Sequence, residues 1–323
     1  DDRYLYWTDD ATHELNRMPK GGGGSVVLAQ PEHPGYVTLV GGHLYWTQRD
    51  MDFQGAYPGQ GGPPRSVVRM PVDGGPVEVV AAGLDAPNEI AVSGDDVAIS
   101  CDGQFEYHRK EEPRGLIVRT TLGGSKPRVV ATKQRRPESL AFVDDDLYWV
   151  NQGWKWPDYF ADGALLRMKR HGDTKRWIVR KNQPMAGSLL VDDAYLYWIT
   201  TPTLVDRTLV GAIYRRPRGG GATTVVTRVF DLDGALLAQD ATHLYWISGS
   251  RGSMYRVAKT GGAPEPMMTC DERFVLARSL VVDDHRVYWT VSDGASVGGA
   301  VWSMGKDPAG LRAPDDAPTE RPN

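Results

Sequence analysis

The chain has 323 residues, with 37 Lys and Arg against 41 Asp and Glu, and a formal net charge of −4. This balance argues against a generic nucleic-acid binder, which needs a basic surface. No apolar run approaches the roughly 20 residues of a transmembrane helix. Two cysteines are too few for a disulfide-rich scaffold, and the 37 Gly and 22 Pro predict many short turns.

One short signature recurs along the chain: a hydrophobic residue, a Tyr-Trp pair and a small residue with β propensity. Six copies occupy residues 5–8, 44–47, 147–150, 196–199, 244–247 and 287–290, and a degenerate copy at 97–100 fills the gap. From Tyr6 to Tyr288 there are 282 residues and six intervals, so the period is 47 residues. This period is close to the length of one four-stranded propeller blade.

The segments around each signature repeat as well. An apolar strand precedes it, as at residues 189–192 and 280–283, and a strand with a recurring arginine follows it. A glycine-rich turn and a Val-Val strand then complete four strands in each unit. The recurring arginines, which we expect to pair with acidic or carbonyl groups between blades, are Arg17, Arg69, Arg119, Arg167, Arg215 and Arg256.

The Tyr-Trp pair predicts how these sheets pack. Successive strand residues point to opposite faces of a sheet, so the two large rings point in opposite directions. A sheet tolerates this pattern when both of its faces are covered, as in a propeller blade. We therefore predict an all-β chain, a seven-bladed β-propeller of four-stranded antiparallel blades over residues 1–304, with a Pro-rich tail over 305–323.

Residues 6–9 read Tyr-Trp-Thr-Asp, which is a complete YWTD motif. The chain resembles the YWTD β-propellers of low-density-lipoprotein receptors and, more closely, bacterial relatives of that repeat. The receptor propellers have six blades, which is the alternative to the seven predicted from the seven signature strands. Bacterial propellers of this kind are often exported, and the chain lacks an initiator Met and begins in the middle of a repeat. The expected location is therefore extracytoplasmic: periplasmic, lipid-anchored or secreted.

In the propellers that the chain resembles, the connections between second and third strands and those between fourth and next first strands emerge on one face. The second-to-third connections of blades 2–5 are long, at residues 48–65, 101–115, 151–163 and 200–211. Long loops in compact domains are often functional, and aromatic side chains supply contact area at low entropic cost. The alternative is that these rings order their own loops. The candidate binding residues on this face are Asp52, Tyr57, Tyr107, His108, Arg109, Trp154, Trp156, Tyr159, Arg135 and Arg136.

A second candidate site lies where first strands begin, at the mouth of the expected channel. Asn88, Glu89 and Glu138 occupy such positions. Resembling enzyme propellers, such as gluconolactonases and paraoxonases, hold calcium there, so Ca²⁺ is the cofactor that the resemblance implies. Calcium takes six to eight oxygen ligands, more than these three side chains supply. The alternative is a set of solvated polar groups.

Other reactive side chains favour structural roles. His43, His243 and His285 share one turn position in different repeats, which indicates a turn preference. Cys101 and Cys270 fall in units three and six and are expected to be free thiols.

Two functions remain open on the sequence. The first is a non-enzymatic binding or assembly module that contacts a protein partner, or a small or carbohydrate-like ligand, through the long loops of blades 2–5. The alternative is a propeller enzyme, a lyase or lactone-type hydrolase, with a divalent ion at the channel mouth. Fold analogy alone does not choose between them.

Overall fold

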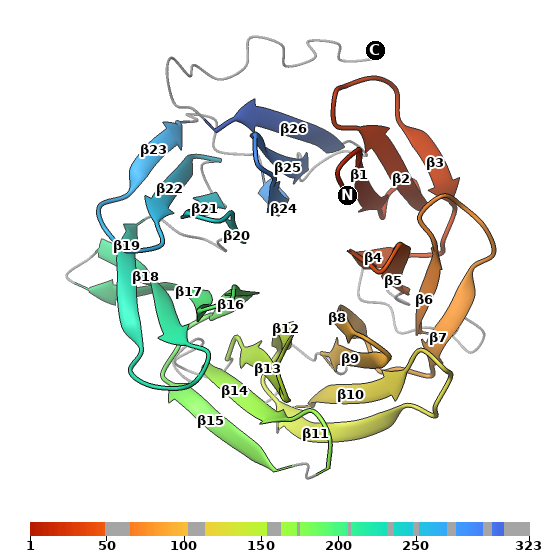
Figure 1. Cartoon of the computed structure of the whole chain (residues 1–323), viewed down its shortest axis with the longest axis horizontal. Coiled ribbons are helices and arrows are strands. Elements are labelled where there is room, and N and C mark those ends of the chain that lie inside the picture. Colours follow the sequence, from red (N-terminus) through yellow and green to blue (C-terminus); the bar gives the residue numbers. More distant parts are fainter. Residues whose placement is uncertain are drawn as a thin grey trace. The chain divides into compact units, whose positions relative to one another are not determined.

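The computed structural model describes residues 1–48, 65–102, 114–153, 163–172, 175–205, 208–230, 236–247, 252–269, 276–292 and 299–306. The chain is a seven-bladed β-propeller, as the repeat predicts, and the described residues contain no helix. The degenerate copy of the signature forms a strand like the others (Figure 1). The chain divides into two compact units, which are residues 1–183 and residues 184–323.

The first unit contains four antiparallel sheets. Sheet 1 has three strands, β1 (Tyr4–Asp9), β2 (Glu14–Pro19) and β3 (Val26–Ala29). Sheet 2 is β4 (Pro34–Val40), β5 (His43–Gln48), β6 (Ser66–Pro71) and β7 (Glu78–Ala82). Sheet 3 is β8 (Pro87–Ser93), β9 (Asp96–Cys101), β10 (Gly115–Thr121) and β11 (Arg128–Gln134). Sheet 4 is β12 (Pro137–Val143), β13 (Asp146–Asn151), β14 (Ala164–Lys169) and β15 (Arg176–Lys181).

The second unit contains three antiparallel sheets. Sheet 5 is β16 (Gly187–Val191), β17 (Tyr195–Val205), β18 (Thr208–Pro217) and β19 (Thr224–Phe230). Sheet 6 is β20 (Leu236–Gln239), β21 (His243–Ile247), β22 (Met254–Ala258) and β23 (Glu265–Met268). Sheet 7 is β24 (Leu276–Val282), β25 (Arg286–Ser292) and β26 (Gly299–Gly305), so sheets 1 and 7 have three described strands each.

Tyrosine and tryptophan rings of the signature fill the space between neighbouring sheets. Trp46, Trp149, Trp198, Trp246 and Trp289 are each at most 2% exposed. The tyrosine that precedes each of them is buried too. The prediction that both faces of these strands are covered is therefore confirmed, and the core lies between the sheets rather than on one side of each.

One glycine is required where a third strand begins. A Cβ atom at Gly163 would lie 1.8 Å from the Gln183 carbonyl oxygen and 2.6 Å from that of Gln152, so no larger residue fits without moving the backbone. The connection that precedes β14 thus ends in close contact with the segment that follows β15.

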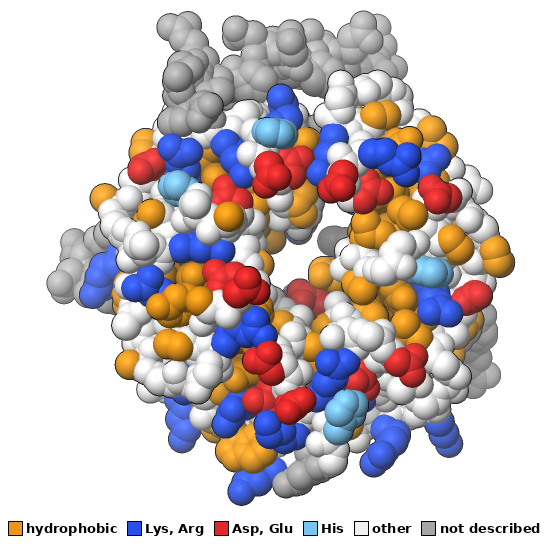
Figure 2. All heavy atoms as spheres, in the orientation of Figure 1, with side chains coloured by type: hydrophobic (Ala, Val, Ile, Leu, Met, Phe, Trp, Pro, Cys, Tyr) orange, Lys and Arg blue, Asp and Glu red, His pale blue; other side chains and the backbone are white. Residues whose placement is uncertain are grey.

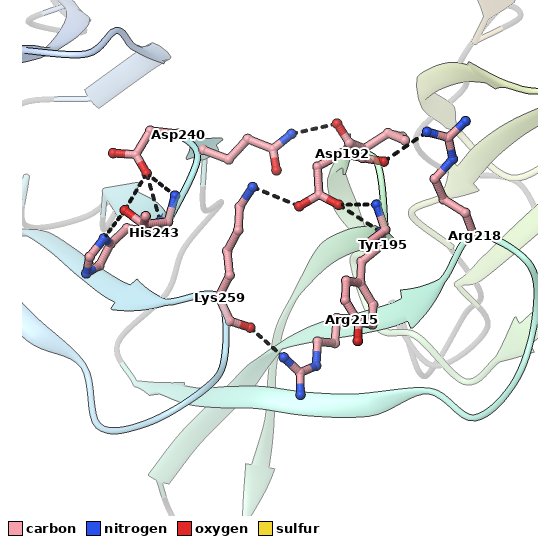
Figure 3. A network of polar contacts seen from close by, with 11 residues as sticks. Asp192, Tyr195, Arg215, Arg218, Asp240, His243 and Lys259 are labelled. Carbon is pink, nitrogen blue, oxygen red and sulfur yellow. Dashed lines mark hydrogen bonds and ion pairs between the residues drawn. The ribbon is translucent and has the colours of Figure 1, made fainter.

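Polar contacts join neighbouring sheets at the end where first and second strands meet in short turns, which we call the turn end. In the second unit, Lys259 Nζ lies 2.8 Å from Asp192 Oδ2 across sheets 5 and 6 (Figure 3). Lys306 makes the same 2.7 Å contact with Asp240 across sheets 6 and 7. Hydrogen bonds from Lys306, Tyr245 and the turn hold the pKa of Asp240 well below its usual range despite its burial.

The predicted pairing of the recurring arginines between blades is seen for Arg215 and Arg256, whereas Arg119 and Arg167 pair with Asp96 and Asp146 of their own sheets. Arg215 Nη1 donates to the Lys259 carbonyl oxygen at 2.6 Å, and Arg256 Nη1 to that of Lys306 at 2.9 Å, each crossing to the next sheet. Arg69 instead pairs with Glu78 within its own sheet at 2.8 Å. Lys/Arg and Asp/Glu side chains are interspersed over the face drawn in Figure 2.

Cys101 is a free thiol, as expected, and lies fully buried in the cluster that joins sheets 2 and 3. Burial raises the pKa of this thiol to about 12. Cys270 lies outside the described residues. No helix in the described part of the chain is long and apolar enough to cross a membrane.

Candidate functional site

Three adjacent sheets of the first unit bring equivalent strand ends together. β4, β8 and β12 lie on the concave side of this unit (Figure 1) and contact one another in order. Each begins with a proline that lies opposite the last residue of the second strand of its sheet. The paired residues are Pro34 and Gln48, Pro87 and Cys101, and Pro137 and Asn151. We call this end of sheets 2–4 the loop end, because the segments 49–64, 103–113 and 154–162 follow β5, β9 and β13 there.

Backbone hydrogen bonds connect the two kinds of segment that meet at the loop end. Asp102 N donates to the Ala86 carbonyl oxygen at 3.0 Å, and Gln152 N donates to that of Arg136 at 3.1 Å. Gly153 N donates to the Arg135 carbonyl oxygen at 3.2 Å. Arg135 and Arg136 therefore lie beside the start of the long connection of blade 4, at residues 151–163. Their role in binding stays a prediction.

The backbone is strained at the same place. Ala86 and Arg136 immediately precede the prolines of β8 and β12, and their φ angles are 51° and 52°. Ser139, two residues into β12, also has a positive φ of 51°. Such conformations cost about 1–3 kcal/mol for residues other than glycine and cluster at functional sites.

Two glutamates approach each other from neighbouring sheets at the loop end. Ser139 N donates to Glu89 Oε2 at 2.5 Å, which places the carboxylate from β8 beside the backbone at the start of β12. Gln152 Nε2 donates to Glu138 Oε2 at 2.5 Å. Tyr36, on β4 of sheet 2, lies close enough to Glu89 for the two side chains to interact electrostatically. The structure thus gathers groups from three sheets around Glu89 and Glu138.

The electrostatics of this pair are unfavourable to charge. Burial of the Glu138 carboxyl, and next the charge of Glu89, raise the pKa of Glu138 to about 8, while Gln152 and Arg136 oppose the shift. Tyr36 is 39% exposed as a residue, and burial at its hydroxyl end together with the charge of Glu89 raises the pKa of Tyr36. Glu138 therefore carries a proton at neutral pH, since two close carboxylates in a crowded site resist joint ionisation.

Some features of this geometry favour the predicted metal site at Asn88, Glu89 and Glu138, and one opposes it. Glu89 and Glu138 lie near each other, and Asn88 precedes Glu89 in the irregular start of β8. Gln152 Oε1 is buried and has no hydrogen-bond partner, so it is a further oxygen donor beside Glu138. Among the described residues, however, no group of three or more His, Cys, Asp or Glu side chains could hold a metal ion.

Most of the predicted binding residues lie outside the described residues. They are Asp52, Tyr57, Tyr107, His108, Arg109, Trp154, Trp156 and Tyr159. What the described strands establish is where their segments begin and end, at the loop end of sheets 2–4.

The predicted long loop of blade 5 is wrong. Residues 200–211 belong instead to an extended hairpin, because β17 continues to Val205 and β18 starts at Thr208, with Thr203 opposite Val210. Alternating Thr, Leu and Val residues, which favour extended backbone, explain why the strands continue.

Sequence reasoning placed Ser139 at a strand start beside Glu138 but missed Tyr36 and Gln152. A signal for Tyr36 exists, because Tyr36, Glu89 and Ser139 each lie two residues after the proline that opens a first strand. Gln152 follows the last residue of β13, and only its contact with Glu138 identifies it.

No protein-family model matches the chain. Solved structures do, at low identity. A chain of a nidogen/laminin complex is 16% identical, with a TM-score of 0.52, covering 79% of this chain and 89% of that one. An oligogalacturonate lyase in complex with manganese is 10% identical, with a TM-score of 0.63, covering 90% and 82%. The β-propeller domain of the trilobed protease from Pyrococcus furiosus is 10% identical, with a TM-score of 0.54, covering 85% and 81%. These likenesses show the propeller fold, which binding proteins and enzymes share.

Proposed function

We propose that the chain is a non-enzymatic binding module whose contact surface is the loop end of sheets 2–4. One observation carries the proposal: three long segments leave adjacent sheets at the place where Glu89 and Glu138 are held together at a cost in stability. Charge repulsion and backbone strain at one end of a repeat fold are features of functional sites. The proposal includes kinship with YWTD propellers and an extracytoplasmic location.

A protein partner is the ligand class that fits best. The segments carry Tyr107, Trp154 and Trp156, and aromatic side chains of this kind dominate binding energy in protein interfaces. The acidic pair at the loop end favours a ligand with a basic group. The solved nidogen/laminin complex gives an example of a similar chain in a protein assembly.

The test is a selection of displayed cyclic peptides on the immobilised full chain. Peptides selected on the natural chain are expected to bind a W154S/W156S chain at least about 30-fold more weakly, the effect of losing one hot-spot side chain. A V79S chain is the matched control, because Val79 is 66% exposed near the start of β7, whereas the loop end of sheet 2 lies at the other end of that strand, where Ala82 pairs with Ser66. Peptides that bind all three chains equally would contradict the proposed surface.

A second function, an enzyme that uses a divalent ion at Glu89 and Glu138, is favoured by the raised pKa of Glu138. A carboxyl group that titrates near neutral pH can lose its proton to a divalent ion and then serve as a ligand of that ion. Bound at Glu89, Glu138 and Gln152 Oε1, an ion would supply Lewis-acid catalysis of a lyase or lactone-hydrolase reaction. The manganese complex of the similar oligogalacturonate lyase supports this alternative.

Calorimetric titration with MnCl₂ and CaCl₂ at pH 7, in two buffers of different ionisation enthalpy, separates the two functions. An ion at this site must displace the Glu138 proton, so the enzyme alternative predicts release of about one proton per ion. An E138Q chain should bind without proton release. Absence of binding at millimolar metal removes the enzyme alternative and leaves the binding module untouched.

A further inference from the structure

The recurring arginine of sheet 3 has a different neighbour from its equivalents in sheets 2 and 6. In those two sheets the arginine lies opposite a glutamate of the outer strand and forms a 2.8 Å ion pair with it. The two pairs are Arg69 with Glu78 and Arg256 with Glu265. In sheet 3 the residue opposite Arg119 is Arg128. The position that holds a carboxylate in sheets 2 and 6 therefore holds a second guanidinium group in sheet 3.

The exchange of glutamate for arginine leaves a donor of Arg119 unused. In sheets 2 and 6, Nε of the recurring arginine donates to the opposing glutamate, at 2.9 Å from Arg69 and 2.8 Å from Arg256. In sheet 3, Nε of Arg119 is buried and has no hydrogen-bond partner among the described residues. A buried donor without a partner destabilises the folded state, as do like charges directly opposite each other on two strands. An acceptor supplied by a ligand would relieve both effects.

One nearby carboxylate, that of Asp96, is already bound more closely by another arginine. Arg170 Nε lies 2.6 Å from Asp96 Oδ2, whereas Arg119 Nη2 lies 3.6 Å from Oδ1. Burial of the guanidinium group, and to a smaller degree the charges of Arg170 and Arg128, lower the pKa of Arg119, whereas Asp96 opposes the shift. A single carboxylate does not neutralise three arginines, so this part of sheet 3 keeps a net positive charge.

The outer strands of sheets 3 and 4 extend this positive charge. Residues 126–136, which include β11, contain five Lys and Arg residues and no Asp or Glu, and residues 175–181, which include β15, contain four and none. The exposed members are Lys126, Arg128, Lys133, Lys175, Arg176 and Lys181. Figure 2 shows Lys and Arg side chains along this rim, at the lower edge of the view. Because the whole chain has a net charge of −4, positive charge is concentrated here, and such a surface attracts anions.

We propose that Arg119 and Arg128 form the centre of a binding site, near the turn end of sheet 3, for an anionic ligand that carries phosphate or sulfate groups. One oxyanion takes the place that the glutamate carboxylate has in sheets 2 and 6, because guanidinium groups bind carboxylate and phosphate oxygens in the same forked geometry. The exposed cations of the rim attract the rest of the ligand. This site is separate from the loop end, so its failure would leave the proposed contact surface there unaffected.

The test is calorimetric titration of the full chain with tripolyphosphate and, separately, with sucrose octasulfate, at pH 7 and constant ionic strength. The natural chain is expected to bind at least one of the two. The ligand that binds more tightly identifies phosphate or sulfate as the preferred oxyanion.

A pair of chain variants locates the site. R128E places opposite Arg119 the glutamate that sheets 2 and 6 have, and it should weaken binding at least about 10-fold because the new carboxylate occupies Arg119. R228E is the matched control, since Arg228 is exposed on the outer strand β19, lies opposite Ala212 and undergoes the same change of charge. It should change the affinity by less than about 2-fold, because exposed charges beyond the screening length contribute little.

Thermal unfolding separates loss of binding from loss of structure. Without ligand, R128E should unfold at a temperature no lower than that of the natural chain, because a repulsive pair becomes an attractive one. The ligand should raise the unfolding temperature of the natural chain and of R228E, but not of R128E. The proposal is overturned if the natural chain binds neither ligand at millimolar concentration, if R128E binds as tightly as the natural chain or unfolds at a lower temperature, or if R228E loses as much affinity as R128E.

Discussion

Sheets 3 and 4 are joined at both of their ends, and the two junctions have opposite electrostatics. At the turn end, Arg170 Nε lies 2.6 Å from Asp96 Oδ2, and the guanidinium also binds the hydroxyl and the carbonyl oxygen of Ser93. At the loop end, two carboxyl groups, Glu89 and Glu138, lie near each other, and burial together with the charge of Glu89 raises the pKa of Glu138. One junction stabilises the fold, whereas the other maintains an electrostatically unfavourable arrangement, which supports the proposed role of the loop end in binding.

The largest expected effect comes from breaking the turn-end junction. R170M removes the shortest ion pair of Asp96, which is 14% exposed, and both hydrogen bonds to Ser93, while Arg119 remains 3.6 Å from Asp96. The combined loss should cost about 3 kcal/mol of unfolding free energy. Chemical denaturation measures the loss. The matched control is R176M, whose exposed arginine donates one hydrogen bond to the Thr132 carbonyl oxygen and should cost less than about 1 kcal/mol. Equal losses in both variants would refute the contrast between the junctions.

The loop end should respond in the opposite direction. In E138Q no carboxyl group has to be kept protonated, so the variant should be about 1–2 kcal/mol more stable than the natural chain at pH 8. Because the folded-state pKa of Glu138 is raised to about 8, the destabilisation of the natural chain begins above the ordinary glutamate value and grows until about pH 8. Thermal unfolding from pH 4 to 8 measures the gain, which should vanish at pH 4. A gain that does not depend on pH would show that Glu138 is not strained by its environment.

The smallest effect sharpens the comparison by testing exposure. His171 Nε2 lies 3.5 Å from Asp96 Oδ2, yet its side chain is 71% exposed. Exposed ion pairs contribute little, so H171A should change the unfolding free energy by less than about 0.5 kcal/mol at pH 6. A larger loss, measured by the same denaturation, would mean that proximity to Asp96, and not burial of Arg170, governs the turn-end junction.

The repeat was readable in the sequence because one physical requirement recurs. Tyr and Trp must both be covered, so the signature recurs at a regular spacing. That spacing allowed even the degenerate copy at residues 97–100 to be assigned to a strand, and β9 confirms it. The segment 200–211 was misjudged because spacing alone does not separate a long loop from a long hairpin. The alternating Thr203, Leu204 and Val205 were the available signal.

The candidate site was only partly readable. Glu89 and Glu138 could be placed at strand starts, but they lie two and one residues after their prolines. Because successive strand residues point to opposite faces, this offset helps turn the two side chains toward each other across the gap between the sheets. The raised pKa of Glu138 follows from burial and from the charge of Glu89 on the neighbouring sheet. Gln152, whose hydrogen bond opposes the shift, lies in a different strand connection and has no sequence signature.

The buried thiol of Cys101 gives the chain an internal reporter of its own motions. A thiolate is the species that alkylating reagents attack, and neither reagent nor hydroxide reaches this sulfur while sheets 2 and 3 remain packed together. In a C270S chain, the rate of iodoacetamide labelling therefore counts how often these two blades separate. The labelling rate thus reports local opening near the carboxylate pair, and no spectroscopic probe has to be attached to the chain beforehand.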